Sequence, residues 1–92
     1  MHEPLAPSAV KALLVKILEH GMVEFSGHAR KEMEADRITE SEVVGVLRGG
    51  VVEVGELERG LWRYRVRKSG TYVVVAFRGE GWTVVVTAWR KK

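Results

Sequence analysis

Three arginines alternate with other residues in the segment RYRVR, at positions 63, 65 and 67. Successive side chains of a β-strand point to opposite faces, so Arg63, Arg65 and Arg67 are predicted to share one face of a sheet. A guanidinium group matches the geometry of phosphate oxygens, and this spacing therefore favours phosphate recognition. The alternative is a solvated face whose charges discourage aggregation.

The residues opposite the arginines follow from the turns. Ser69-Gly70 predicts a two-residue hairpin turn, which pairs Arg67 with Tyr72. In the same register Arg65 lies opposite Val74. The next turn is predicted as a four-residue loop, residues 78–81, because this length keeps the apolar residues of the last strand on one face. A three-residue loop would swap the faces of that strand.

These residue types suit metal-independent cleavage of RNA. The preferred register predicts one row across three strands, formed by Arg67, Tyr72 and Thr87. Arg67 would stabilise the charge that develops on the phosphorane, and His28 or Tyr72 would move the proton of the 2′-hydroxyl. Thr87 would orient a phosphate oxygen or the tyrosine. Structural roles are the alternatives: His28 as a brace of its helix, Tyr72 in cross-strand packing and Thr87 as a strand former.

A wider set of basic and aromatic residues is predicted to bind the RNA strand, because phosphates need charge and bases need stacking surfaces. For Trp89 the alternative is to plug the end of the sheet. The predicted RNA-binding residues are Arg63, Arg65, Arg67, Lys68, Trp89, Arg90 and Lys91.

The charge is divided unevenly along the chain. Residues 1–58 hold six Lys/Arg and eleven Asp/Glu, whereas residues 59–92 hold nine Lys/Arg and one Glu. The second part therefore has a net charge of +8, which indicates that this part meets a polyanion.

Several classes of site are not indicated by the sequence. The chain has no cysteine, no HExxH motif, no carboxylate cluster and no phosphate-loop motif, so neither a metal nor a nucleotide cofactor is expected. No stretch approaches the roughly 20 apolar residues of a membrane span, and the first residues do not resemble a signal peptide. A cytoplasmic protein without membrane contact is therefore expected.

The elements that must position these residues can be read from periodicity. A loose leader, residues 1–7, is expected to precede a helical part, residues 8–49, and a strand-rich part, residues 51–90, within a single domain covering 1–92. Thr39 with Glu42 forms a capping-box pattern. Helices followed by strands predict an α+β fold, with the N-terminal helices packed on one face of a C-terminal four-stranded antiparallel sheet.

The core of this fold is predicted from the side of the strands opposite the arginines. Trp62, Phe77, Val75 and Val84 are expected to be among the most buried residues, and Trp82 is assigned to the same core.

Two segments resemble a known family. Residues 25–50, FSGHARKEMEADRITESEVVGVLRGG, are similar to a signature of small bacterial proteins of undefined function related to MqsR and to RelE/ParE-type toxins. Its matching positions are His28, Ala29, Met33, Arg37, Ile38, Thr39 and Val43. The later YVVVAF…WTVVVTAW resembles the closing strands of that family, including Thr87.

The resemblance implies the toxin-ribonuclease fold, with RNA on the open face of the sheet and an antitoxin protein as a partner. Taken with the basic face, it leads to the prediction of a toxin-like, metal-independent endoribonuclease that cleaves single-stranded RNA by attack of the 2′-hydroxyl. The alternative is a non-catalytic module of the same fold that binds RNA or a protein.

Overall fold

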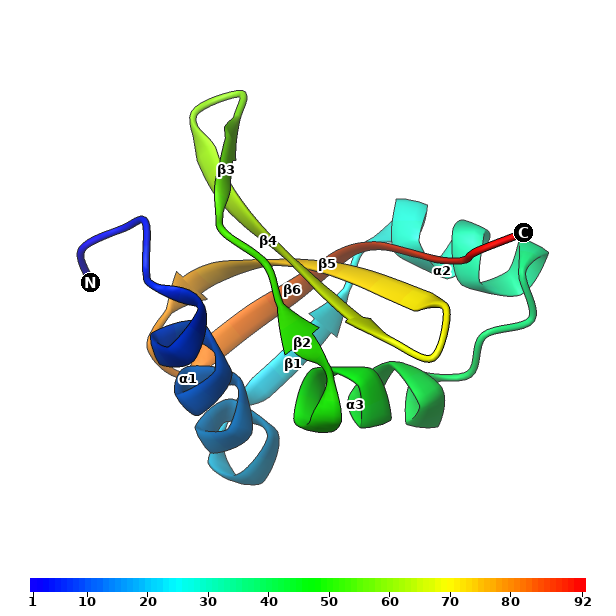
Figure 1. The fold of residues 1–92 in the computed structure, drawn as a ribbon, viewed down its shortest axis with the longest axis horizontal. Coiled ribbons are helices and arrows are strands. Elements are labelled where there is room, and N and C mark those ends of the chain that lie inside the picture. The colour runs from blue at the N-terminus through cyan, green and yellow to red at the C-terminus, as the bar shows by residue number, and fades with distance from the viewer.

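The structure, a computed structural model, describes all residues 1–92 and contains three helices and six strands (Figure 1). In chain order the elements are α1 Pro7–His20, β1 Met22–Phe25, α2 Gly27–Ala35, α3 Glu40–Gly49, β2 Val51–Val52, β3 Glu56–Glu58, β4 Leu61–Lys68, β5 Thr71–Gly79 and β6 Trp82–Arg90. The predicted α+β class is confirmed.

The strands form a mixed sheet of the order β1-β6-β5-β4-β2, and β3 pairs with β4 beside this path. All pairs are antiparallel except β1 with β6, which run parallel. The prediction of a four-stranded antiparallel sheet is therefore wrong. The short strand β1 lies far from β6 in sequence, and a local pattern of residues does not reveal such a distant partner.

The start of the strand-rich part, from Val51 to Glu58, is divided into two short strands, β2 and β3. The chain crosses the buried side chain of Tyr64 at Gly55, where a Cβ atom would lie 2.6 Å from the ring atom Cε1. Beyond this crossing, β3 and the start of β4 form a hairpin that projects away from the rest of the sheet (Figure 1).

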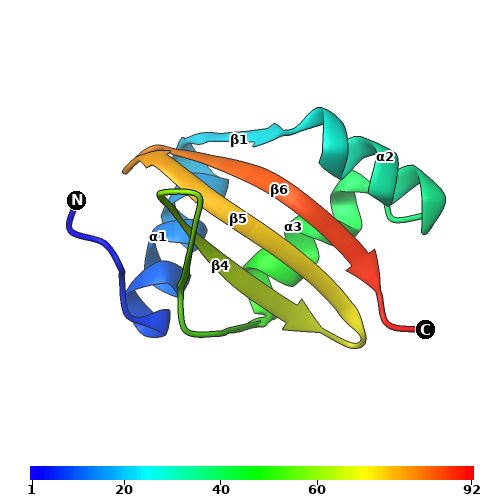
Figure 2. The same cartoon turned by 90° about the horizontal axis from the view of Figure 1, so that it is seen from above.

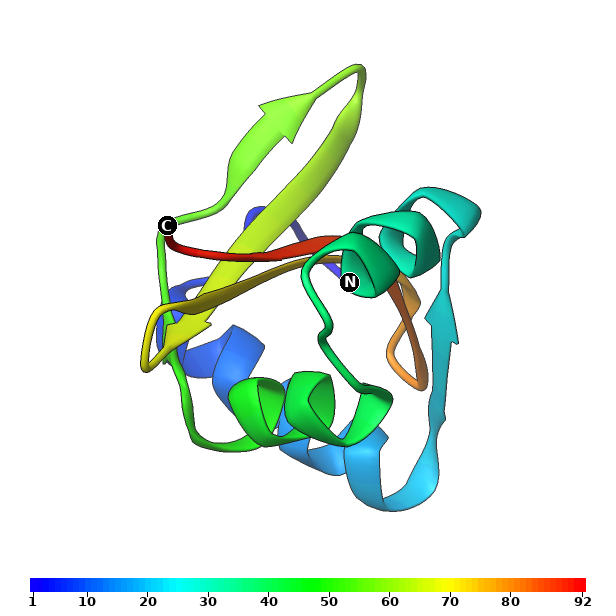
Figure 3. The same cartoon turned by 90° about the vertical axis from the view of Figure 1, so that its right-hand side faces the viewer.

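Helices α1 and α3 lie below the sheet, on the face opposite the projecting hairpin, as Figure 3 shows. Their apolar side chains pack against Tyr64, which is the largest fully buried side chain. The buried residues of the two helices and the sheet include Val10, Leu14, Ile17, Val43, Val46, Leu47, Val66, Val73, Val75, Val85 and Ala88. Packing of the helices on this face leaves the other face of β4, β5 and β6 open, and Figure 2 shows these three strands crossing the molecule side by side.

The predicted core is correct for Val75 and Val84, which are buried. Trp62 and Phe77 are only half-buried and pack against the margin of the core. Trp82 is wrongly assigned to the core, because it is 37% exposed and its indole N–H donates to the Glu24 carboxylate at 3.1 Å.

The register of the β4–β5 hairpin is as predicted, with Arg67 opposite Tyr72 and Arg65 opposite Val74. The β5–β6 register is not. Trp82 lies opposite Gly79, so only two residues, 80–81, form the turn instead of four.

Two irregularities also interrupt the β5–β6 ladder. One lies between Val74 and Val75, where β6 has an extra residue, and one lies between Phe77 and Gly79, where β5 has one. Because each extra residue shifts the register by one, the two shifts cancel at the turn. With the two-residue turn, Thr87 lies opposite Val74 and Trp89 opposite Tyr72, so the predicted row of Arg67, Tyr72 and Thr87 is wrong.

The N-terminal leader is not loose. The backbone N–H of Leu5 donates to the Tyr64 hydroxyl at 3.0 Å, and that hydroxyl donates to the Glu3 carboxylate at 2.8 Å. The leader therefore covers the hydroxyl group of Tyr64, the largest fully buried side chain.

Further along the chain, the predicted capping box of Thr39 and Glu42 at the start of α3 is confirmed.

Candidate functional site

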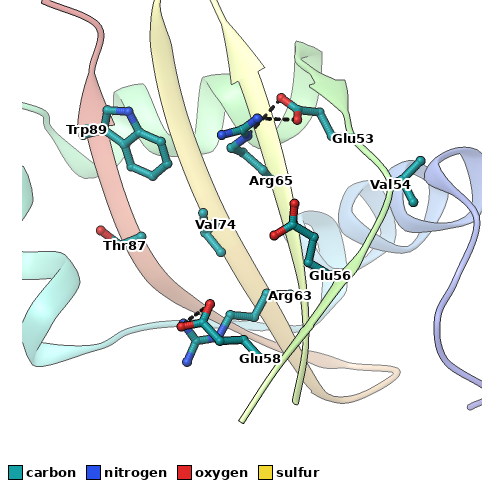
Figure 4. Close-up of a pocket in the computed structure, with 9 residues that line it drawn as sticks. All are labelled: Glu53, Val54, Glu56, Glu58, Arg63, Arg65, Val74, Thr87 and Trp89. Carbon is teal, nitrogen blue, oxygen red and sulfur yellow. Dashed lines mark hydrogen bonds and ion pairs between the residues drawn. The ribbon is translucent and has the colours of Figure 1, made fainter. Parts of the chain in front are cut away.

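A cleft of about 340 Å³ lies on the open face of the sheet (Figure 4). Strands β4, β5 and β6 provide its floor, and residues 53–58 provide a wall. We call residues 53–58, which contain three glutamates, the acidic strap. The residues that line the cleft are Glu53, Val54, Glu56, Glu58, Arg63, Arg65, Val74, Thr87 and Trp89.

The alternation of β4 places Arg63 and Arg65 in the cleft, as expected for residues two positions apart on one face. The acidic strap reaches them because β3 pairs with β4 in a register that sets Glu56 opposite Arg63. Cross-strand partners have neighbouring side chains on the same face, and the glutamates therefore lie beside the arginines.

Arg65 is held by the acidic strap. Its Nε and Nη2 atoms donate to the two oxygens of Glu53 at 3.0 and 2.6 Å, and its guanidinium also lies 5.5 Å from the centre of the Tyr72 ring. These hydrogen bonds from Arg65 lower the pKa of the Glu53 carboxyl. The same carboxylate also forms an ion pair with Arg67, whose Nε atom lies 3.3 Å from Oε2 of Glu53. Glu53 is therefore an ionised structural partner of two arginines.

Arg63 is held far less firmly. Its Nη1 atom lies 3.4 Å from an oxygen of Glu58, a longer contact than either Arg65 hydrogen bond. Its Nε atom is buried and has no hydrogen-bond partner, and it is the one buried side-chain nitrogen or oxygen of the protein in this condition. A buried donor without an acceptor costs free energy, and Arg63 is therefore less completely hydrogen-bonded than Arg65.

Two further polar groups in the cleft are open to a ligand. Glu56 is exposed and takes part in no ion pair, although its carboxylate faces the arginine side of the cleft (Figure 4). Thr87 contributes a hydroxyl from β6, across the floor from Arg63 (Figure 4). The cleft thus combines a free guanidinium donor, a free carboxylate and a hydroxyl.

The matched part of the chain contains this whole site. A family model described as "Domain of unknown function (DUF4258)" matches residues 25–90, more than two thirds of the chain. The chain belongs to the DUF4258 family. Neither a comparison with curated proteins nor one with solved structures found a match.

The predicted proton-transfer residues of this DUF4258 chain do not line the cleft. His28 is exposed near the start of α2, two residues after Ser26, whose hydroxyl donates to the carbonyl of Val86 at 2.9 Å. Tyr72 is half-buried and stacks on Trp89, with ring centres 5.2 Å apart and planes 5° apart. Arg67 lies beyond the cleft, so the structure brings together only Arg63, Arg65, Thr87 and Trp89 of the predicted site residues.

Arg90 was predicted to bind RNA, but its guanidinium is engaged inside the protein. It donates to the carbonyls of Asp36 and Arg37, to the Thr71 hydroxyl and to the Glu42 carboxylate, at 3.2, 3.0, 3.2 and 2.5 Å. Lys68 lies apart from the cleft and lines a smaller hollow of about 240 Å³ near α3, and Lys91 is exposed. These three basic residues therefore do not line the cleft.

The sequence analysis missed Glu53, Glu56 and Glu58. These acids lie in the part of the chain with negative net charge, and they fold over the arginines of the part with positive net charge. The segment ELE at 56–58, followed after two residues by LWR at 61–63, was a usable signal, because a hairpin between the two segments sets Glu56 opposite Arg63.

No group of three or more His, Asp or Glu side chains in the protein is arranged to hold a metal ion. None of the three helices has the length and apolar composition that crossing a membrane requires.

Proposed function

We propose that this DUF4258 protein binds single-stranded RNA in the cleft and cleaves it without a metal ion, as a toxin-like endoribonuclease. The observation that carries the proposal is Arg63, whose guanidinium has a single ion pair, at 3.4 Å, in a cleft that also offers an unpaired carboxylate. The resemblance to RelE- and MqsR-type toxins supports the same placement, because it implies RNA on the face of the sheet that the helices leave open.

Arg63 would bind the scissile phosphate. Its fork of donors fits two phosphate oxygens, and displacement of the 3.4 Å contact with Glu58 costs little because exposed ion pairs contribute little to stability. Arg65 would add positive charge nearby while Glu53 keeps its orientation. Donors already in place around developing charge are the usual source of transition-state stabilisation in phosphoryl transfer.

A carboxylate would take the proton. In the reaction the 2′-oxygen attacks phosphorus, the bond from phosphorus to the 5′-oxygen breaks, and a proton passes from the 2′-hydroxyl to the base. The leaving 5′-oxygen receives a proton, so the products are a 2′,3′-cyclic phosphate and a 5′-hydroxyl. Glu56 suits the role of base better than His28 or Tyr72, because only Glu56 lines the cleft. Thr87 would orient a phosphate oxygen.

A non-catalytic binding module is the second candidate. It is favoured by the engagement of Arg65 and Arg67 with Glu53, which reduces the positive charge that the arginine face offers to RNA. Both candidates predict binding in the cleft, and only the endoribonuclease predicts product formation.

The test uses an RNA oligonucleotide, in EDTA, with its 2′-deoxy counterpart. The wild type should cleave only the RNA and leave 2′,3′-cyclic ends. Arg63→Ala should lower the rate by about 10²–10³, the usual effect of removing one transition-state donor. Glu56→Gln should also lower the rate. Arg48→Ala is the matched control, because Arg48 is an exposed arginine on α3, away from the cleft.

Binding is measured separately between 50 and 200 mM salt. Affinity should fall as salt rises, and Arg63→Ala should reduce the slope of log K against log salt by about 1. Binding of RNA without cleavage at high protein concentration would rule out the endoribonuclease and support the non-catalytic binding module. An affinity that does not depend on salt, or no binding, would overturn both candidates.

A further inference from the structure

Apolar side chains are unusually exposed along one short stretch of the chain. The protein has seven large hydrophobic residues that are exposed, and four of them fall within residues 51–61. They are Val51, Val54, Leu57 and Leu61, with exposed fractions of 54%, 75%, 59% and 58%. A concentration of this kind marks an interaction surface more often than a free one.

The same stretch contains a strand with one unpaired edge. β3 pairs with β4 on one side only, and the hairpin that they form stands away from the body of the protein (Figures 1 and 3). A strand edge with unpaired N–H and C=O groups is a template for another strand. The segment GELERGL, residues 55–61, contains no lysine or proline, so the charges that protect this edge are the two glutamates of β3 and Arg59.

The side chains of β3 define what a neighbouring strand would carry. Glu56 and Glu58 line the cleft and so point to one face, whereas Leu57 alternates to the other. In an added strand, every second residue would lie beside the two carboxylates and the residues between would lie beside Leu57. Basic residues alternating with apolar residues satisfy both faces.

We propose that the outer edge of β3 binds an extended segment of a partner protein, by strand addition, and that this segment alternates basic and apolar residues. A second copy of this chain is disfavoured, because antiparallel pairing of two β3 strands about Leu57 would set Glu56 of each copy beside Glu58 of the other. RNA is disfavoured at this edge because it has no peptide backbone that could pair with the unpaired N–H and C=O groups of β3. The proposal does not depend on RNA binding in the cleft.

The test uses a nine-residue synthetic peptide that alternates lysine and valine. Two comparison peptides have the same composition in scrambled order or carry N-methyl groups that block strand pairing. The alternating peptide should bind the purified protein at least tenfold more tightly than either, and the backbone amides that shift in NMR spectra should lie within residues 53–61.

Leu57→Lys should weaken binding of the alternating peptide at least tenfold, because it places a positive charge beside the apolar positions of the peptide. Met22→Lys is the matched control, because Met22 is exposed to a similar extent, 54% against 59% for Leu57, on β1 at the other edge of the sheet. The N-methylated peptide keeps the test valid if Leu57→Lys does not fold. Equal binding of the scrambled peptide, amide shifts at β1, or no binding would overturn the proposal. Dimerisation of the protein through β3 without peptide would also overturn it.

Discussion

Two arginines on the same sheet have opposite surroundings. Arg90, at the end of β6, donates hydrogen bonds to four groups of the α2–α3 loop, α3 and β5, and its own backbone N–H donates to Asp36 at 2.9 Å. Arg63, in the cleft, has one ion pair at 3.4 Å and a buried Nε without a partner. Arg90 therefore connects parts of the fold, whereas Arg63 has hydrogen-bond donors that remain unpaired.

The difference shows that residue type and charge do not distinguish a structural arginine from a binding one. Arg90 and Arg63 both lie in the basic part of the chain, and both were predicted to bind RNA. The number of engaged hydrogen-bond donors distinguishes them, because a guanidinium with four of its five donors engaged must break those bonds before it can bind phosphate. The comparison therefore predicts different effects when each arginine is removed.

The largest expected effect on stability is that of Arg90→Ala. The substitution frees the α2–α3 loop from β6 and removes all four guanidinium contacts. We expect the Tm to fall by about 8–16 °C, which corresponds to about 2 kcal/mol in a domain of this size. Arg63→Ala should change the Tm by less than a quarter of that amount. Thermal unfolding followed by circular dichroism gives both values, and equal shifts would show that the comparison is wrong.

The local structure and the first hairpin could be predicted from the sequence, because both depend on neighbouring residues. The capping box of Thr39 and Glu42, the turn at Ser69-Gly70 and the pairing of Arg67 with Tyr72 are confirmed. Each of these features follows from the types of residues close in sequence.

The β5–β6 register could not be predicted from alternation. A loop of two residues and a loop of four residues give β6 the same alternation of faces, so burial alone could not exclude the wrong loop length. Two irregularities then shift residues 83–85 by one position relative to β5. One of them leaves Val86 outside the ladder, where its carbonyl accepts the Ser26 hydroxyl that caps α2. The faces of residues 83–85 therefore depend on the docking of a helix about 60 residues earlier in the chain.

Only the arginines of the candidate site could be predicted from the sequence, and the acidic strap could not. Its arginines follow from the period of β4, whereas the acidic strap reaches them only because the chain turns at Gly55 over the Tyr64 ring. A long-range crossing of this kind has no signature in local propensity. The charge of the cleft, which depends on the strap, was therefore overestimated.

The next effect in size concerns acid pH. Hydrogen bonds from the Arg90 backbone N–H lower the pKa of Asp36, and hydrogen bonds from the Arg90 side chain lower the pKa of Glu42. A carboxyl whose pKa is lower in the folded state stabilises the protein above its unfolded-state pKa and loses this contribution as pH falls through the folded value. The Tm should therefore drop below about pH 4.

Glu42→Gln tests this origin of the acid sensitivity. Glutamine keeps the capping-box geometry at this position but cannot ionise. The variant should have a lower Tm than the wild type at pH 7, and the gap between the two should narrow towards pH 3. A gap that is constant over this range would assign the acid sensitivity to other carboxyls.

A smaller effect is expected at Arg65, whose guanidinium makes more hydrogen bonds than that of Arg63 and fewer than that of Arg90. Arg65→Ala releases Glu53 and with it the acidic strap, while the core beneath is unchanged. Exposed ion pairs contribute little to stability, so we expect hydrogen exchange of amides 53–58 to accelerate about two- to fivefold. Amides of β5 should keep their rates. Exchange that accelerates over the whole sheet would mean that Arg65, like Arg90, supports the global fold.

The smallest expected effect is that of Lys92→Ala, and it isolates the contribution of Arg90. Lys92 lies 3.4 Å from the same Asp36 carboxylate that accepts the Arg90 N–H, but its side chain is 84% exposed. Water and salt screen such a contact, and its long side chain loses entropy when it is held, so the Tm should change by no more than about 2 °C. The measurement is thermal unfolding at low and at 0.5 M salt. A drop as large as that of Arg90→Ala would mean that net charge at the end of β6, rather than the geometry of the Arg90 hydrogen bonds, holds the α2–α3 loop in place.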